Sequence, residues 1–120
     1  MIIVSTKQVK IAHNVIISKT GGRKDIRDEG LLESAIMSPF QLDCKYKTVE
    51  EKIARISYNI IKNHPFIDGN KRVGAHVMLL LLIANGIGIC YRHDELYNII
   101  MNIANKGTYE DLLDWIKLHE

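Results

Sequence analysis

The chain has 120 residues, a formal net charge of +2, 47% hydrophobic residues and 25% charged residues. A chain of this length buries roughly two thirds of its unfolded surface, which is enough for a core without disulfides or structural metals. We therefore expect one domain over residues 1–120. The net charge is too small for an electrostatic footprint on nucleic acid, so no direct nucleic-acid partner is expected.

The cysteines and the apolar segments indicate a cytoplasmic protein. The two cysteines, Cys44 and Cys90, form neither a disulfide framework nor a CxxC pair, and free thiols are typical of a reducing cytosol. The apolar start at residues 1–4 is too short for a signal peptide. The longest apolar run, residues 77–84, falls far short of the roughly 20 residues that span a bilayer. It predicts a buried helix, and no membrane partner is expected.

The first third of the chain is predicted to be helical after a short lead. Residues 1–5 form a short strand or an extended arm. A helix then begins at Ser5 or Thr6 and is stopped by the glycine pair at residues 21–22. Asp28 is the expected N-cap of a second helix, which ends before Pro39 because the residue before a proline disfavours helical geometry.

Residues 39–47 break the helical period. Apolar and polar side chains alternate there, which is a weak signal for a strand or a hairpin. An ordinary linking loop explains the same pattern equally well. The alternating residues are Leu42, Cys44 and Tyr46 on one side and Asp43, Lys45 and Lys47 on the other.

The rest of the chain predicts four more helices, which makes the fold all-α. Thr48 and Glu51 form a capping box for a long helix that ends near Asn63. The buried helix that follows runs to Asn85 and is ended by glycines at residues 86 and 88.

The last two helices have start signals of their own. Asp94 is the expected cap of the first, which Gly107 ends, and Thr108 with Asp111 caps the second.

The stretch from His64 to Arg72 concentrates more chemistry than any other part of the sequence. It reads His-Pro-Phe-Ile-Asp-Gly-Asn-Lys-Arg and lies between two long helical patterns. His64 precedes a proline, so it is expected at or just past a helix end. Phe66 and Ile67 are apolar and are expected to anchor the loop to the core, and Gly69 can take a positive φ in the turn that follows.

These residue types suit the transfer of a phosphoryl or nucleotidyl group. With Asn70 as N-cap, the next helix points free N–H groups and a partial positive charge at the loop, which makes an anion site beside Lys71 and Arg72. Asp68 is a carboxylate that can hold Mg²⁺ together with phosphates, and His64 can act as a base at neutral pH. A plain helix–loop–helix with surface cations is the alternative, but the conjunction of all these residues favours the chemistry.

The stretch resembles the signature of the Fic/Doc superfamily, His-x-Phe-x-(Asp/Glu)-Gly-Asn-(Gly/Lys)-Arg. Most Fic AMP-transferases carry Gly where this chain has Lys71, and a second Arg where it has Ala75. Both departures resemble the Doc (death-on-curing) branch. Residues 21–22, 26–35 and 109–116 also look Doc-like, so the resemblance covers nearly the whole chain.

The resemblance implies a single compact all-α Fic-fold domain, with a short flap, in the form of a possible β-hairpin, at residues 39–47. It implies that ATP and Mg²⁺ are the cofactors and that Asp68 holds the metal. The phosphates are expected on Gly69, Asn70, Lys71 and Arg72, and the catalytic residues are expected to be His64, Asp68 and Arg72.

The resemblance further implies a Doc-like toxin of a bacterial toxin–antitoxin pair. Such a toxin transfers phosphate to a Ser or Thr hydroxyl of a protein substrate, by resemblance a translation elongation factor such as elongation factor Tu, and so blocks translation. The expected partner is a small Phd-type antitoxin. The alternatives are a Fic-type protein AMP-transferase and a catalytically silent binding module with the same fold.

Overall fold

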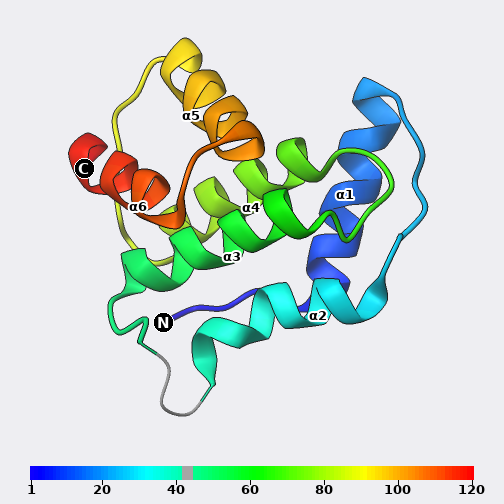
Figure 1. The fold of residues 1–120 in the computed structure, drawn as a ribbon, viewed down its shortest axis with the longest axis horizontal. Helices are drawn as coiled ribbons and strands as arrows, with labels where there is room; N and C mark the ends of the chain where they lie inside the picture. The colour runs from blue at the N-terminus through cyan, green and yellow to red at the C-terminus, as the bar shows by residue number, and fades with distance from the viewer. Residues whose placement is uncertain (42–44) are drawn as a thin grey trace.

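The computed structural model of the protein describes residues 1–41 and 45–120, and its regular structure there is helical (Figure 1). These residues contain no strand, only a bridge between Ile26 and Phe66. The radius of gyration is 13.3 Å, close to the roughly 13.6 Å expected for a globular domain of this length. The all-α prediction is confirmed. The elements are α1 (Thr6–Thr20), α2 (Glu29–Met37), the 3₁₀ turn η1 (Ser38–Phe40), α3 (Val49–Asn63), α4 (Asn70–Ala84), α5 (His93–Asn105) and α6 (Tyr109–His119).

The helix pair α3 and α4 forms the centre of the molecule. The two helices lie side by side, and α3 also packs against α2 and α6 (Figure 1). Gly74 permits the close approach, because a Cβ atom there would lie 2.7 Å from Cγ1 of Ile61. The buried hydroxyl of Ser57 donates to the carbonyl of Gly74 at 2.9 Å. The chain reverses between the two helices at residues 64–69, so the motif lies at one end of the most buried part of the fold.

The lead at residues 1–5 is an extended arm and not a strand. Ile2 donates its N–H to Oδ1 of Asn85 at 2.7 Å, and Nδ2 of Asn85 donates to the carbonyl of Ile2 at 3.0 Å. A side chain at the end of α4 therefore pairs with the arm in place of a strand. Helix α1 then begins with a capping box between Ser5 and Gln8 and ends at Gly21, which has a φ of 87°.

The flap was predicted at residues 39–47. Three of these residues, Leu42, Asp43 and Cys44, lie outside the part of the chain that the structure describes. On its near side α2 gives way to η1, and on its far side residues 45–47 carry no strand. The ring of Tyr46 contacts the ring of Tyr109 edge-on, with 5.1 Å between the centroids. The guanidinium of Arg55 lies 5.5 Å from the same Tyr46 ring. The far end of the segment is thus anchored on α3 and α6.

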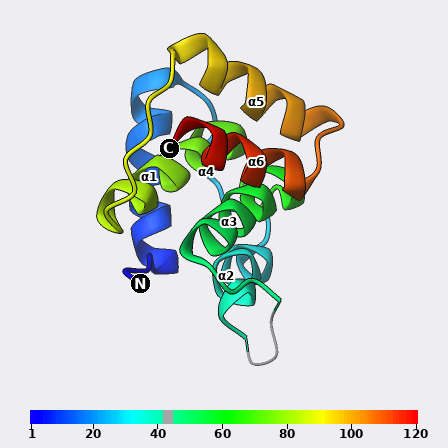
Figure 2. The ribbon, with the colours of Figure 1, turned by 90° about the vertical axis from the view of Figure 1, so that its left-hand side faces the viewer.

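Helices α5 and α6 pack against each other and cover α3 and α4 on the side away from α2 (Figure 2). The predicted cap of α5 at Asp94 is wrong. The helix starts after Arg92, because Oε1 of Glu95 reaches back to accept the N–H of Arg92 at 2.8 Å, and Asp94 lies in the first turn. The caps predicted at Asp28, Thr48 and Thr108 are all present.

No helix in residues 1–41 and 45–120 is long and apolar enough to cross a membrane. Cys90 is a free, exposed thiol, as expected, while Cys44 lies outside the described part.

Candidate active site

His64 lies just past the end of α3, as its place before Pro65 predicted. It is the cap residue and adopts left-handed backbone geometry, with φ 50° and ψ 60°. Arg27 donates from Nε to the carbonyl of His64 and from a terminal nitrogen to the carbonyl of Asn63, both at 2.6 Å. A guanidinium on the last carbonyls of a helix satisfies them and complements the helix dipole. The backbone of His64 is therefore fixed, while its imidazole is exposed.

The segment before α2 lies along the motif loop and holds it by backbone hydrogen bonds. Arg27 and Asp28 both donate their N–H groups to the carbonyl of Pro65, at 2.8 and 3.0 Å, and Ile67 donates to the carbonyl of Asp25 at 3.1 Å. Phe66 is buried at the centre of this pairing. The anchoring role expected of Phe66 agrees with this placement, whereas Ile67 is exposed.

Asp68 is held at both its side chain and its backbone. Its Oδ2 accepts the backbone N–H of Arg23 at 2.8 Å. Its carbonyl oxygen lies 2.6 Å from Nε2 of His13, a buried residue of α1. Among residues 1–41 and 45–120, no group of three His, Cys, Asp or Glu side chains could hold a metal ion. A magnesium ion on Asp68 would thus need oxygen ligands from a bound phosphate, which is how Mg²⁺ is commonly held.

The prediction that Asn70 caps α4 is wrong. The cap is Gly69, with a φ of 82° and no side-chain hydrogen bond, and Asn70 is the first helical residue. The side chain of Asn70 instead turns back into the loop, where Oδ1 accepts the N–H of Phe66 at 3.0 Å and Nδ2 donates to the carbonyl of Phe66 at 2.9 Å. Its Nδ2 also lies 3.4 Å from Nδ1 of His64.

The start of α4 keeps its backbone donors open. Within the described residues, no acceptor is hydrogen-bonded to the N–H groups of residues 69–72, and the first intrahelical bond joins Val73 N–H to the carbonyl of Gly69 at 2.9 Å. Free N–H groups at a helix start carry a partial positive charge and suit an anion. The start of α4 therefore offers the unpaired backbone donors that a bound anion would need.

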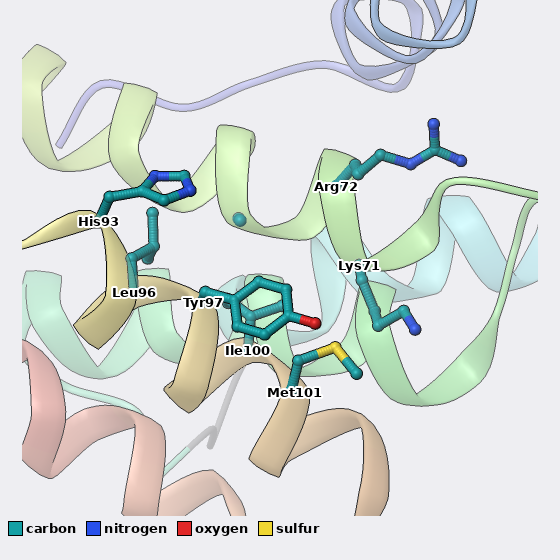
Figure 3. Close-up of a pocket in the computed structure, with 8 residues that line it drawn as sticks. Lys71, Arg72, His93, Leu96, Tyr97, Ile100 and Met101 are labelled. Carbon is teal, nitrogen blue, oxygen red and sulfur yellow. The ribbon is translucent and has the colours of Figure 1, made fainter. Parts of the chain in front are cut away.

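The two cations of the motif diverge from the first turn of α4 (Figure 3). Arg72 donates to the hydroxyl of Thr20 and to the carbonyl of Gly21, the latter at 3.0 Å, and so caps the end of α1. Both residues also line a cavity, and the side chain of Lys71 extends away from that of Arg72 (Figure 3). The structure thus brings Lys71 and Arg72 to the same turn but gives them different surroundings.

The cavity lies between the first two turns of α4 and the helix α5 (Figure 3). Its volume is about 430 Å³, within the range of small-molecule sites. Apart from the cations its walls are largely apolar, and the small side chain of Ala75 leaves the space open on the α4 side. The lining residues are Lys71, Arg72, Ala75, His93, Leu96, Tyr97, Ile100 and Met101.

Sequence reasoning missed His13, Arg23, Arg27 and this cavity. One signal was available for His13. Val9, His13 and Ile17 recur every four residues and are the buried residues of α1, so the histidine lies on a stripe that faces the core. Nothing in the local sequence indicates that this stripe meets the motif loop.

The Fic/DOC family model matches residues 3–82, and the chain belongs to this family. The toxin Doc of Mycolicibacterium smegmatis is 31% identical over 78 residues, which are 62% of this chain and 59% of that protein. The match therefore spans less than two thirds of the relative's length. The predicted resemblance to the Fic/Doc superfamily and its Doc branch is confirmed.

Proposed function

We propose that residues 1–120 form one Fic/Doc domain that transfers the γ-phosphate of Mg²⁺–ATP to a Ser or Thr hydroxyl of a target protein. The observation that carries this proposal is the largely apolar cavity next to Lys71, at the place where Ala75 replaces a second arginine. An apolar cavity suits a nucleoside better than a polyphosphate, because a buried phosphate needs charged or hydrogen-bonding partners.

The phosphate that is transferred lies at the start of α4 in this proposal. The N–H groups of residues 69–72 donate to its oxygens, and the helix dipole adds to their effect. Lys71 stands between this position and the cavity, where it can neutralise the phosphates that link the two. Arg72 holds the end of α1, and its charge lies at the same turn.

Asp68 is the residue that would hold the magnesium ion. Its Oδ2 is fixed by the N–H of Arg23, so the carboxylate has a defined direction before any ligand arrives. The ion, when bound, supplies positive charge that offsets the charge of the phosphates. The single carboxylate fits an ion that shares its remaining positions between phosphate and water.

His64 takes the proton from the target hydroxyl. Its backbone is fixed by Arg27, its ring is exposed, and the amide of Asn70 is within reach of its Nδ1. A neutral imidazole has one ring nitrogen without a hydrogen, and this nitrogen can accept the proton of the hydroxyl. The hydroxyl oxygen then bonds to the γ-phosphorus, the bond from that phosphorus to the β-phosphate oxygen breaks in line with it, and ADP leaves.

The nucleotide orientation distinguishes the two possible products. With the γ-phosphate at the start of α4, the nucleoside enters the cavity between α4 and α5, and the product is a phosphoprotein. With the α-phosphate there, the β- and γ-phosphates would enter the same cavity. His93 and Tyr97 offer polar atoms in it, but the second arginine of Fic AMP-transferases is missing and the other walls on α5 are apolar. The apolar walls favour the first orientation.

We propose a biological role as the toxin of a toxin–antitoxin pair. The support is the Doc branch resemblance and the relative that is itself named a toxin. The protein substrate is then a translation elongation factor such as elongation factor Tu, and the inhibitory partner is a small Phd-type antitoxin. A disordered antitoxin segment that folds on binding would make the inhibition reversible.

The proposal is tested with purified protein, bacterial lysate, and ATP labelled separately at the α- and γ-phosphate. Label from γ, absent with His64→Ala, is the expected result. Label from α alone would make the protein an AMP-transferase. Label from neither, with both a lysate and purified elongation factor Tu, would favour a silent binding module and overturn the proposal.

The cavity assignment has a separate test. Ala75→Leu should raise the KM for ATP about tenfold, because the larger side chain fills the space assigned to the nucleoside. Ala84→Leu, at the other end of the same helix, is the matched control and should leave the KM unchanged. An unchanged KM in Ala75→Leu would remove the nucleoside from this cavity.

A further inference from the structure

His13 is a buried histidine that the proposed chemistry does not use directly. It belongs to α1, its exposed fraction is 1%, and it lies 55 positions before Asp68 in the chain. Its ring stacks on Phe66 with 3.7 Å between the centroids and 8° between the planes. Its Nε2 lies 2.6 Å from the carbonyl oxygen of Asp68. Since a carbonyl can only accept, Nε2 carries a hydrogen and donates it.

The hydrogen bond from His13 falls on the carbonyl that one more residue of α4 would use. In an α-helix the N–H of Arg72 would bond the carbonyl four residues earlier, which is that of Asp68. In this chain Gly69 leaves right-handed helical geometry with its φ of 82°, and the Asp68 carbonyl is directed at His13 and not along the axis of α4. Helix α4 therefore starts at Asn70, and the N–H of Arg72 stays available.

The same bond sets the direction of a peptide plane. The chain has no cis peptide bond in its described part, so the N–H of Gly69 points opposite to the carbonyl of Asp68. With the carbonyl directed at α1, that N–H is directed away from α1. A Cβ atom on Gly69 would lie 3.4 Å from Nε2 of His13 and 2.8 Å from Cδ1 of Ile17, so α1 also fixes how closely the turn approaches.

We propose that His13 is a positioning residue: it holds the Asp68–Gly69 peptide so that the metal carboxylate and the free N–H groups of α4 are set before substrate binds. This inference rests on the proposed function. A leucine at this place would satisfy packing alone, whereas a buried imidazole is costly unless its hydrogen bond is needed. The hydrogen bond from His13 to the Asp68 carbonyl satisfies the buried imidazole and explains why a histidine and not an apolar residue stands at this place.

A matched pair of variants separates the hydrogen bond from packing. In His13→Gln the side-chain amide can donate from nearly the position of Nε2, and in His13→Leu the volume is kept without a donor. The Leu variant should lower kcat for γ-phosphate transfer about 10- to 100-fold, measured well below its Tm, and the Gln variant should recover most of the loss. A Gln variant that folds but is as slow as the Leu variant would overturn the proposal.

A second readout needs neither nucleotide nor activity. In ¹⁵N-labelled protein without ligand, His13 should show a protonated Nε2. The amide signals of Gly69 and Arg72 should shift clearly further in His13→Leu than in His13→Gln, since both variants lose the ring but only the Leu variant loses the donor. If wild type transfers no label but these signals behave as expected, the proposed function fails and the positioning stands. If Nε2 of wild-type His13 is unprotonated, or if the Gly69 signal is the same in wild type and in both variants, the positioning role is wrong even when wild type is active.

If the Leu variant does not fold, the positioning role is tested by the protonation of Nε2 in wild type and by the activity of the Gln variant.

Discussion

Helix α4 begins differently from α3 and α6. In α3 the hydroxyl of Thr48 accepts the N–H of Glu51 at 3.1 Å and Oε1 of Glu51 accepts the N–H of Thr48 at 3.0 Å. Thr108 and Asp111 make the same box for α6. In α4 the cap is a glycine, and no side chain bonds the first N–H groups.

The difference separates a structural helix start from a functional one. A capping box satisfies its donors locally, within four residues of chain. The start of α4 is held by distant residues instead, by His13 on the Asp68 carbonyl and by the N–H of Arg23 on the Asp68 carboxylate. Asn70 adds a local bond to Phe66, but it leaves the first N–H groups of the helix free. The start of α4 lacks the usual side-chain cap and is stabilised by other contacts. Such a departure from local sequence preference is expected at a functional site.

Among the variants considered, Gly69→Ala should disturb the start of α4 most and cause the largest loss of transfer activity. The residue has a φ of 82°, and its Cβ would lie 2.8 Å from Cδ1 of Ile17, so the turn must shift. We expect label transfer to fall by a factor on the order of 100 or more, because misplaced reacting groups are that costly. The measurement is γ-phosphate transfer at a temperature where the variant is folded.

The control for this variant is Gly86→Ala. Gly86 also has a positive φ, 74°, but nothing lies within 4 Å of its Cβ position. It should lose about 1–2 kcal/mol of stability from strain alone, with transfer unchanged. Equal activity losses at Gly69 and Gly86 would mean that strain in general, and not the start of α4, accounts for the effect.

Asn70→Asp should have the next largest effect. The aspartate can still accept the N–H of Phe66, but it cannot donate to the carbonyl of Phe66 as the amide does at 2.9 Å. A buried carbonyl facing a carboxylate oxygen should cost about 1–3 kcal/mol and lower transfer about tenfold or more. Urea unfolding and label transfer measure the two effects, and Asn59→Asp, a buried amide away from the motif, should lose stability without loss of transfer in the folded protein.

Thr108→Ala tests a helix start with a capping box, that of α6. Removing the hydroxyl leaves the N–H of Asp111 without its acceptor and should cost about 1 kcal/mol of unfolding free energy. Transfer by the folded protein should not change, since the start of α6 is bonded to Glu51 at the start of α3, whereas the motif follows the end of α3. A loss of transfer larger than the loss of folded fraction would show that capped starts also matter for function.

His119→Asn should have the smallest effect, and its effect should depend on pH. Bonds to the carbonyl of Trp115 and to Glu95 raise the pKa of His119, while the N–H of Arg92 and the bond to His119 lower the pKa of Glu95. The histidine's contribution to stability is therefore full below its unfolded pKa of about 6.5 and is lost as the pH rises through its folded pKa. The glutamate's contribution is present above its ordinary pKa and is lost as the pH falls through its lowered folded value.

The difference in urea midpoint between wild type and His119→Asn should thus be larger near pH 5.5 than at pH 8.5, which lies well above the usual histidine range. A difference that grows with pH would contradict the ion pair between His119 and Glu95. Transfer activity should be the same in both proteins at either pH.

Local rules predicted most of the fold and the position of the motif. The hydroxyl and carboxylate caps at Asp28, Thr48 and Thr108 act within four residues, so sequence alone is enough to find them. Asn70 and Asp94 were assigned as caps by the same rule and were wrong. Each is outcompeted by a neighbour, the glycine at 69 that turns the chain and the glutamate at 95 that bonds Arg92.

The supports of the site lie beyond such rules. His13 and Arg23 reach Asp68 across 55 and 45 positions of chain, and Arg27 reaches His64 across 37. These contacts depend on how α1 and the segment after it pack against the α3–α4 pair. The cavity beside Lys71 likewise needs α5 to lie along α4. A single sequence contains no direct record of either arrangement.

The pairing of residues 25–28 with residues 65–67 has a thermodynamic consequence. The motif loop is hydrogen-bonded to residues 25–28 and to α1, so it should not unfold locally while the rest of the domain stays folded. Releasing the loop requires α1 and α2 to separate from α3 and α4. In a urea titration, loss of transfer should coincide with loss of helical circular dichroism. Nucleotide binding should then carry little ordering entropy. The amide exchange rates of Phe66 and Ile67, whose N–H groups are hydrogen-bonded, should match those of α3.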